Sequence, residues 1–125
     1  MMLDTCALLF LASGDVRLSR TVRQRLSNAP IRWFCAISSY EIALKYQKAQ
    51  LKLPASPADW IERVALRYSL SEVSVDSALC CAAAALPPHH RDPFDRFIIA
   101  GAQRLGCAVV TVDPIFAKYG VEVLA

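Results

Sequence analysis

This chain of 125 residues is 55% hydrophobic and long enough to bury a core, so we interpret residues 1–125 as a single domain. Its apolar runs fall far short of the ~20 residues of a membrane span, and it lacks the charged start of a signal peptide, so we expect a cytoplasmic protein without membrane contact. The net charge of +3 is too small to indicate nucleic acid by itself, and five cysteines without a C-x-x-C pair predict buried, reduced thiols in place of disulfides or zinc.

The pattern of apolar residues alternates between strands and helices. In chain order, we expect a strand at 1–4, helices at 7–13 and 20–28, a strand at 31–37, helices at 38–50 and 57–69, a strand at 70–75, helices at 77–86 and 93–105, a strand at 107–112, a short helix at 114–120 and a strand at 121–124. Ser19, Ser56 and Asp76 are suited to cap the helices that follow them. This order predicts an α/β fold, a three-layer α/β/α domain with a central, mostly parallel sheet.

Four acidic residues stand close to the ends of these strands, namely Asp4, Glu41, Asp95 and Asp113. Ligands of such sheets bind beyond the carboxyl ends of the strands, so we expect the four side chains to converge there. Two carboxylates ~4 Å apart repel each other by about 4 kcal/mol at an effective dielectric constant of ~20. A cluster of this kind therefore needs a cation or a proton, and ligands that are all oxygen atoms favour Mg²⁺ or Mn²⁺ over zinc.

Local physics offers a structural interpretation for two of these acids. Asp92 is suited to be an N-cap, and Asp95 would then lie in the first turn of the same helix, where a carboxylate favours the free N–H groups. Ser38 and Glu41 have the spacing of a capping box. Each of these acids could therefore begin a helix without taking part in any site.

The other two acids differ from each other. Asp113 is suited to cap a helix, whereas Asp4 follows a strand start without an obvious cap to make, where short acidic residues are rare. Without the four acids, 14 basic residues face 7 acidic ones, a balance of +7. An acidic pocket in an otherwise basic surface suits a metal-dependent nuclease, with the ion for the chemistry and lysine and arginine for the phosphate backbone.

Four segments of the chain form a longer pattern: "LDTCALL" at 3–9, "AISSYEIALK" at 36–45, "HRDPFDRFIIAGA" at 90–102 and "VTVDPIFAKYGVEVL" at 110–124. In this order, and over nearly the whole chain, they resemble the PIN-domain ribonucleases, in particular the VapC toxins of prokaryotic toxin–antitoxin pairs. The "HRDPFDR" block with the T-x-D-x-x-F-x-x-Y-G tail is the specific part. Cys6 and Tyr40 depart from the pattern, since similar sequences often have histidine and tryptophan there, but neither is one of the acids.

The resemblance implies Mg²⁺- or Mn²⁺-dependent cleavage of RNA, a homodimer, and inhibition by a small VapB-like antitoxin. It implies that the catalytic and metal-binding residues are Asp4, Glu41, Asp95 and Asp113. Asp92 would lie close by, and we expect Thr5 and Ser38 to support the metal-binding residues by hydrogen bonding.

Basic residues next to this block allow two interpretations each. Arg91 and Arg96 could hold RNA phosphates or pair with the neighbouring aspartates. His89 and His90 could be metal ligands or a general base, or could belong to an exposed Pro-Pro-His-His connection.

Other functions fit parts of the pattern. A phosphoaspartyl enzyme of the haloacid-dehalogenase type also begins with a strand and an aspartate, but "DTCAL" lacks the second aspartate of its D-x-D. A non-catalytic PIN module that binds RNA or protein would usually lose one of the acids, and all four are present. A PIN nuclease for RNA processing stays open, although the short chain without added domains favours the toxin.

Overall fold

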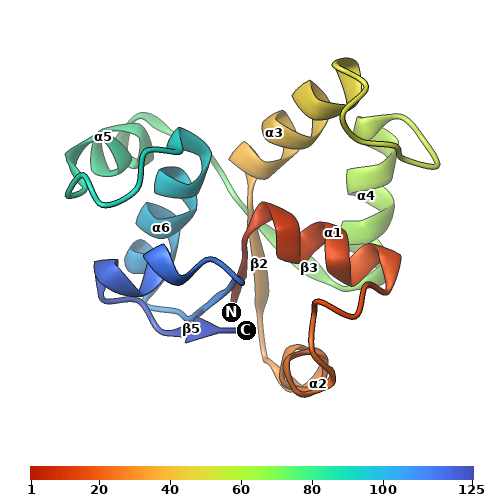
Figure 1. The fold of residues 1–125 in the computed structure, drawn as a ribbon, viewed down its shortest axis with the longest axis horizontal. Helices are drawn as coiled ribbons and strands as arrows, with labels where there is room; N and C mark the ends of the chain where they lie inside the picture. The colour runs from red at the N-terminus through yellow and green to blue at the C-terminus, as the bar shows by residue number, and fades with distance from the viewer.

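The computed structural model describes residues 1–125 and contains five short parallel strands surrounded by helices (Figure 1). The elements are β1 (Met2–Leu3), α1 (Thr5–Ser13), α2 (Arg20–Asn28), β2 (Arg32–Cys35), α3 (Ala36–Gln47), α4 (Pro57–Arg67), β3 (Leu70–Val73), α5 (Ser77–Ala85), α6 (Pro93–Leu105), β4 (Val109–Val110), the 3-10 helix η1 (Pro114–Tyr119) and β5 (Val123–Leu124). The predicted alternation of strands and helices is therefore confirmed.

The strands form one sheet in the order β3-β2-β1-β4-β5, with every neighbouring pair parallel. The central strand β1 pairs on both sides, with Met2 opposite Trp33 of β2 and Val109 of β4. The carboxyl ends of all five strands consequently meet at one edge of the sheet, where Asp4 follows β1 directly.

Successive residues of the central strands point to opposite faces of the sheet and join different cores. Leu3 and Val110 pack with residues of α1, α2, α3 and α4, whereas Met2 and Val109 pack with residues of α5, α6 and η1. Figure 1 shows the same division, with α1, α3 and α4 on one side of the sheet and α5 and α6 on the other. The three-layer α/β/α arrangement is confirmed.

The predicted N-caps are confirmed by their hydrogen bonds. Ser19, Ser56 and Asp76 accept from backbone N–H groups in the first turns of α2, α4 and α5, at 3.2, 3.3 and 2.7 Å. The predicted strand bounds are too long, because β4 and β5 pair over only two residues each, as does β1 with its neighbours. The segment predicted as a strand at 31–37 turns into α3 at Ala36.

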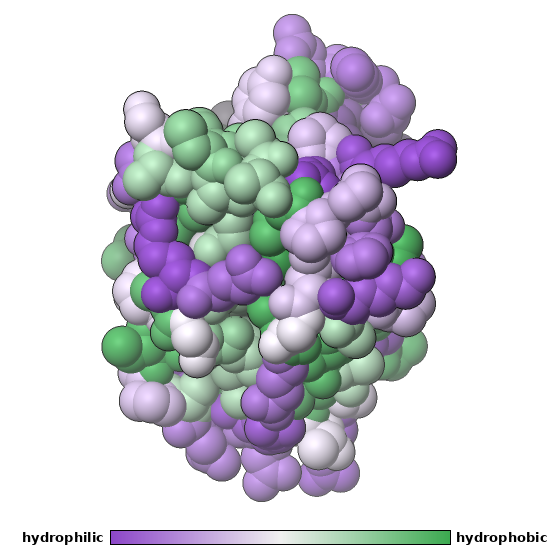
Figure 2. Space-filling view, turned by 90° about the vertical axis from the view of Figure 1, so that its left-hand side faces the viewer, coloured by the Kyte–Doolittle hydropathy of each residue, from purple (hydrophilic) through white to green (hydrophobic).

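Cysteine burial differs from the prediction. All five cysteines are free, but only Cys35 is buried, and Cys6, Cys80 and Cys81 are exposed. Cys80 and Cys81 are exposed because they lie on the face of α5 that points to solvent, together with several alanines. Figure 2 views the molecule from the α5–α6 side and shows apolar residues gathered over its upper part. The helices of this structure are each too short or too polar to span a lipid bilayer.

Candidate metal centre

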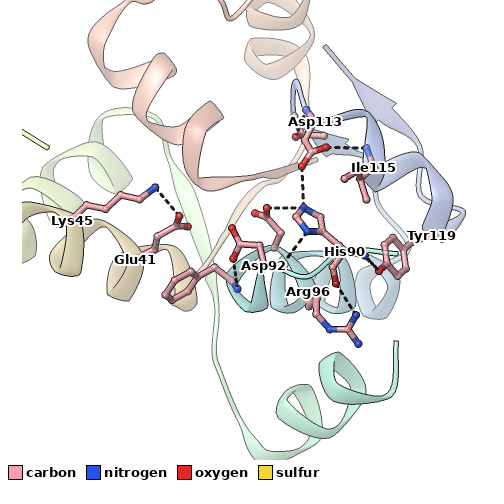
Figure 3. A network of polar contacts seen from close by, with 11 residues as sticks. Glu41, Lys45, His90, Asp92, Arg96, Asp113, Ile115 and Tyr119 are labelled. Carbon is pink, nitrogen blue, oxygen red and sulfur yellow. Dashed lines mark hydrogen bonds and ion pairs between the residues drawn. The ribbon is translucent and has the colours of Figure 1, made fainter. Parts of the chain in front are cut away.

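The carboxyl edge of the sheet carries acidic side chains from four segments of the chain. Figure 3 shows part of this edge, with Glu41, Asp92 and Asp113 labelled. Asp4 follows the central strand β1, and Asp113 follows the adjacent strand β4. Glu41 lies in the helix after β2, on the other side of β1, and Asp95 lies in the first turn of α6. Because α6 leads back to the start of β4, its N-terminus lies at the same edge as the strand ends. The structure therefore places the four acids at the same edge of the sheet, and their charges act on one another there.

Asp4 is buried, with only 5% of its surface exposed. Its Oδ1 accepts a hydrogen bond from the N–H of Ala7 at 2.7 Å, so it caps α1. The interpretation that Asp4 makes no cap is therefore wrong, because the strand ends at Leu3 and the helix begins at Thr5. Burial raises the pKa of this carboxyl, as do the charges of Glu41 and Asp113, although hydrogen bonds from Thr111 and Ala7 oppose the shift.

Glu41 lies in the second turn of α3 and is 7% exposed. The predicted capping box is absent, because α3 begins at Ala36 and its N-cap, Cys35, makes no side-chain cap. One carboxylate oxygen, Oε2, accepts from Nζ of Lys45 at 2.9 Å. The other, Oε1, is buried without any hydrogen-bond partner. An oxygen left in this state costs about 1–3 kcal/mol or more, so it is available for a ligand.

Asp95 shows most clearly that the carboxylates of the cluster repel one another. Burial raises its pKa to about 8, and the charges of Asp92, Asp4, Glu41 and Asp113 add to this effect. Asp92, by contrast, accepts from the N–H of Phe94 at 2.9 Å and is the N-cap of α6. The two neighbouring aspartates therefore differ, since one begins the helix and the other faces the remaining acids.

Asp113 is tied to its neighbours at both oxygens. Oδ1 accepts from the N–H of Ile115 at 2.9 Å, which confirms the predicted cap of η1. Oδ2 lies 2.9 Å from Nε2 of His90. The hydroxyl of Thr111, which also reaches Asp4, accepts from the N–H of Asp113 at 3.0 Å. Thr111 thus connects two of the acids, and only its place in the T-x-D motif pointed to it in the sequence.

His90 is part of the only group of three or more possible ligand atoms that lie within 4.8 Å of one another, together with Asp95 and Asp113. Its Nε2 is 2.9 Å from a carboxylate oxygen of each of them. Asp4 and Glu41 do not join this group. His90 is therefore part of the site and not merely an exposed connection, whereas His89 is exposed and packs edge-on against Tyr119.

The two arginines of the block have different surroundings. Arg91 is exposed. The terminal nitrogens of Arg96 donate to five backbone carbonyls between Ala83 and His90, at 2.7 to 3.3 Å. Arg96 forms no ion pair with the aspartates. Its terminal nitrogens are bonded to carbonyls and hold the α5–α6 connection, which argues against the interpretation that they bind an RNA phosphate.

The supporting hydroxyls lie between the helices that carry two of the acids. Oγ1 of Thr5 donates to Oγ of Ser38 at 2.9 Å, and both residues are buried. Lys45, which sequence reasoning missed, supplies the one cation bonded to a carboxylate of the cluster; its i,i+4 spacing from Glu41 was the available signal.

These residues fit a divalent cation. Oxygen atoms dominate the donor set, Glu41 has a buried oxygen without a partner, and the pKa of Asp95 is raised by burial and by unneutralised neighbours. Hard cations such as Mg²⁺ and Mn²⁺ prefer oxygen donors of this type.

Comparisons with known proteins agree with this geometry. A model of the PIN domain family matches residues 1–122. Among solved structures, VapBC2 from Rickettsia felis bound to a promoter DNA fragment is similar, with a TM-score of 0.71 and 13% identity over 98% of this chain and 96% of the other. DNA-bound VapBC from Salmonella typhimurium has a TM-score of 0.70 and 20% identity over 98% and 95% of the two chains. FitAB bound to the IR36 DNA fragment has a TM-score of 0.67 and 19% identity over 98% and 92%. No curated protein sequence matches the chain.

Proposed function

The chain belongs to the PIN domain family, a family of nucleases, and from this premise we propose that it is a Mg²⁺- or Mn²⁺-dependent endoribonuclease acting as the toxin of a toxin–antitoxin pair. The observation that carries the proposal is the arrangement of carboxylates at one sheet edge, where Oε1 of Glu41 is buried without a partner and oxygens of Asp95 and Asp113 lie within 4.8 Å of each other. Burial and the charges of four neighbouring carboxylates raise the pKa of Asp95 to about 8, which agrees with this arrangement. A bound cation would relieve the repulsion among these carboxylates. Strongly perturbed pKa values of this kind cluster at functional sites.

Asp4, Glu41, Asp95 and Asp113 would hold the ion. When bound, the ion supplies Lewis acidity toward water and neutralises charge on the phosphodiester. Asp4 and Asp113 stand at helix N-termini, where the dipole and the capped N–H groups fix their orientation. Glu41 is held at one oxygen by Lys45 and offers the other. The chain thus orients its carboxylates before any ion or substrate arrives.

The charge outside the acidic cluster supports a substrate with a phosphate backbone, and RNA is the substrate class we propose. Without the four acids, 14 basic residues face 7 acidic ones. Basic side chains outside the cluster would bind the phosphate backbone, and the exposed Arg91 next to the site is a candidate for such a contact. Arg96 is not such a candidate, because its terminal nitrogens are already bonded to carbonyls.

A small VapB-like antitoxin and a second copy of the chain are the proposed protein partners. The similar structures of VapBC from two organisms support the first. The exposed apolar face of α5 supports a further contact, since solvent-exposed apolar patches commonly mark interfaces (Figure 2). In this role the protein would act in the cytoplasm of a prokaryote.

Cleavage of single-stranded RNA by the purified protein tests the nuclease. Cleavage should require Mg²⁺ or Mn²⁺, stop in EDTA and be lost in Asp95→Asn. Asp59→Asn is the matched control, because Asp59 is exposed yet, like Asp95, lies in the first turn of a helix that begins with proline. Activity undiminished by chelation would exclude the metal mechanism.

Expression in cells tests the toxin role separately. Growth should arrest when the protein is expressed alone and recover when the small partner encoded beside it is co-expressed. RNA cleavage in vitro by a protein that is harmless to cells would favour RNA processing over the toxin.

A further inference from the structure

His90 is held by contacts of both its backbone and its ring (Figure 3). The backbone N–H of His90 donates to the hydroxyl of Tyr119 at 2.6 Å, and that hydroxyl donates to the carbonyl of Pro87 at 2.7 Å. Its carbonyl accepts from Arg96 at 3.1 Å, and its ring packs edge-on against Phe116, with 5.8 Å between centroids. A side chain held in this way has little freedom to turn, so the direction of each ring nitrogen is informative.

The two ring nitrogens face groups of opposite kind. Nδ1 accepts a hydrogen bond from the N–H of Asp92 at 3.2 Å. A ring nitrogen that accepts carries no proton, so the proton of the neutral ring is on Nε2. Nε2 is also the atom that lies 2.9 Å from oxygens of both Asp95 and Asp113. An N–H at Nε2 suits both neighbours, because Asp113 meets it in hydrogen-bond geometry and an oxygen of Asp95 lies at the same distance.

Binding of an ion by Nε2 would require the opposite arrangement. The proton would have to move to Nδ1, where it would face the N–H of Asp92, donor against donor. The three-atom group of His90, Asp95 and Asp113 is therefore better explained by hydrogen bonding than by three ligands.

We propose that His90 is a positioning residue: its Nε2–H holds the carboxylates of Asp95 and Asp113 in place for the ion without binding the ion itself. This role rests on the proposed function, because the two aspartates are the proposed ligands. Each carboxylate oxygen can take more than one partner, so the oxygens beside Nε2 keep capacity for a cation. Groups that orient ligands from behind in this way determine metal affinity.

Mn²⁺ binding by the purified full chain tests the proposal without relying on activity. His90→Leu removes the donor and should weaken binding by about 10- to 100-fold, the range for partners of metal ligands. His90→Gln can place an amide N–H near the position of Nε2, so this variant should bind Mn²⁺ less than ~10-fold more weakly than the wild type. His89→Leu is the control one residue away, and it should bind as the wild type does, because His89 touches none of the acids.

Pulsed electron paramagnetic resonance of the Mn²⁺ complex separates positioning from ligation. The wild type should show no strong coupling to a directly bound ¹⁴N nucleus. A strong coupling that disappears in His90→Gln would make His90 a ligand and overturn the proposal, as would unchanged binding by His90→Leu or equal losses in the two His90 variants. If Asp95→Asn also binds Mn²⁺ like the wild type, the metal centre itself is refuted, which identifies a failure of the proposed function and not of His90 alone.

Discussion

Thr5 and Ser38 join the two helices that carry Asp4 and Glu41, through a buried hydrogen bond of 2.9 Å from Oγ1 of Thr5 to Oγ of Ser38. Thr5 is the residue after Asp4, and Ser38 is one turn before Glu41. The bond therefore fixes the relative position of α1 and α3 next to the site.

Thr5→Val should lower the free energy of unfolding by about 1–3 kcal/mol, because the shape is kept while the hydroxyl of Ser38 loses its buried partner. The double variant with Ser38→Ala should lose less than the sum of the single losses, since no polar group is left unpaired. Urea unfolding in EDTA measures all three variants. Thr21→Val, at an exposed position in the first turn of α2, should stay within about 0.5 kcal/mol of the wild type. Additive losses would disprove the coupling.

Asp92 and Asp95 should respond differently to substitution. Asp92→Ala removes the N-cap of α6 and should cost about 0.5–2 kcal/mol of stability, whereas Asp92→Ser keeps a cap and should cost much less. Both variants should retain part of the RNA cleavage. Asp95→Asn should keep or gain stability in EDTA, because the amide needs neither to take up a proton nor to place a charge in the repulsive cluster on folding, and it should lose cleavage. Thermal melts and cleavage assays on the same preparations make the comparison, and preserved cleavage in Asp95→Asn would contradict the proposed site.

The pKa of Asp95 predicts how stability depends on pH without metal. The pKa is about 8 in the folded protein and near its ordinary value of 3.8 when unfolded. Between these values the folded state binds the extra proton, so the contribution of Asp95 to stability is present below about pH 4 and is lost as the pH rises toward 8. In EDTA, the wild type should therefore lose stability over this range relative to Asp95→Asn. A constant difference between the two proteins from pH 4 to 8 would show that Asp95 is not perturbed.

Much of the fold follows from local signals in the sequence. The N-caps at Ser19, Ser56 and Asp76 are short-range hydrogen bonds, so each helix start could be predicted from adjacent residues. The strand bounds could not be predicted in this way, because β4 pairs with β1 over only two residues. The strand β1 ends at Leu3, since Asp4 begins the helix α1. Strand length is thus decided by neighbours that are distant in sequence.

The candidate site shows the same limit. The four acids could be predicted to converge, because every parallel strand ends at the same edge. The contacts of His90 could not, since they depend on Tyr119, Phe116 and Asp113, which are more than 20 residues away along the chain. The same holds for Arg96, whose carbonyl partners are presented only when α5 packs beside α6.

Arg91 and Arg96 provide the last test, since both were candidates for RNA phosphates. Arg96→Met leaves five carbonyls without their donor and should lower the free energy of unfolding by at least about 1.5–3 kcal/mol, the value of one hydrogen bond to a charged group. Arg91→Met is the matched control and should stay within about 0.5 kcal/mol, because Arg91 is exposed. RNA binding, measured in an Asp95→Asn background, should be affected in the opposite way, with the larger loss in Arg91→Met. Loss of one phosphate contact in Arg91→Met should weaken binding and reduce the slope of log affinity against log salt by about 1, whereas Arg96→Met should leave that slope unchanged wherever the protein is folded. A reduced slope in Arg96→Met with native stability would return Arg96 to the RNA-binding surface.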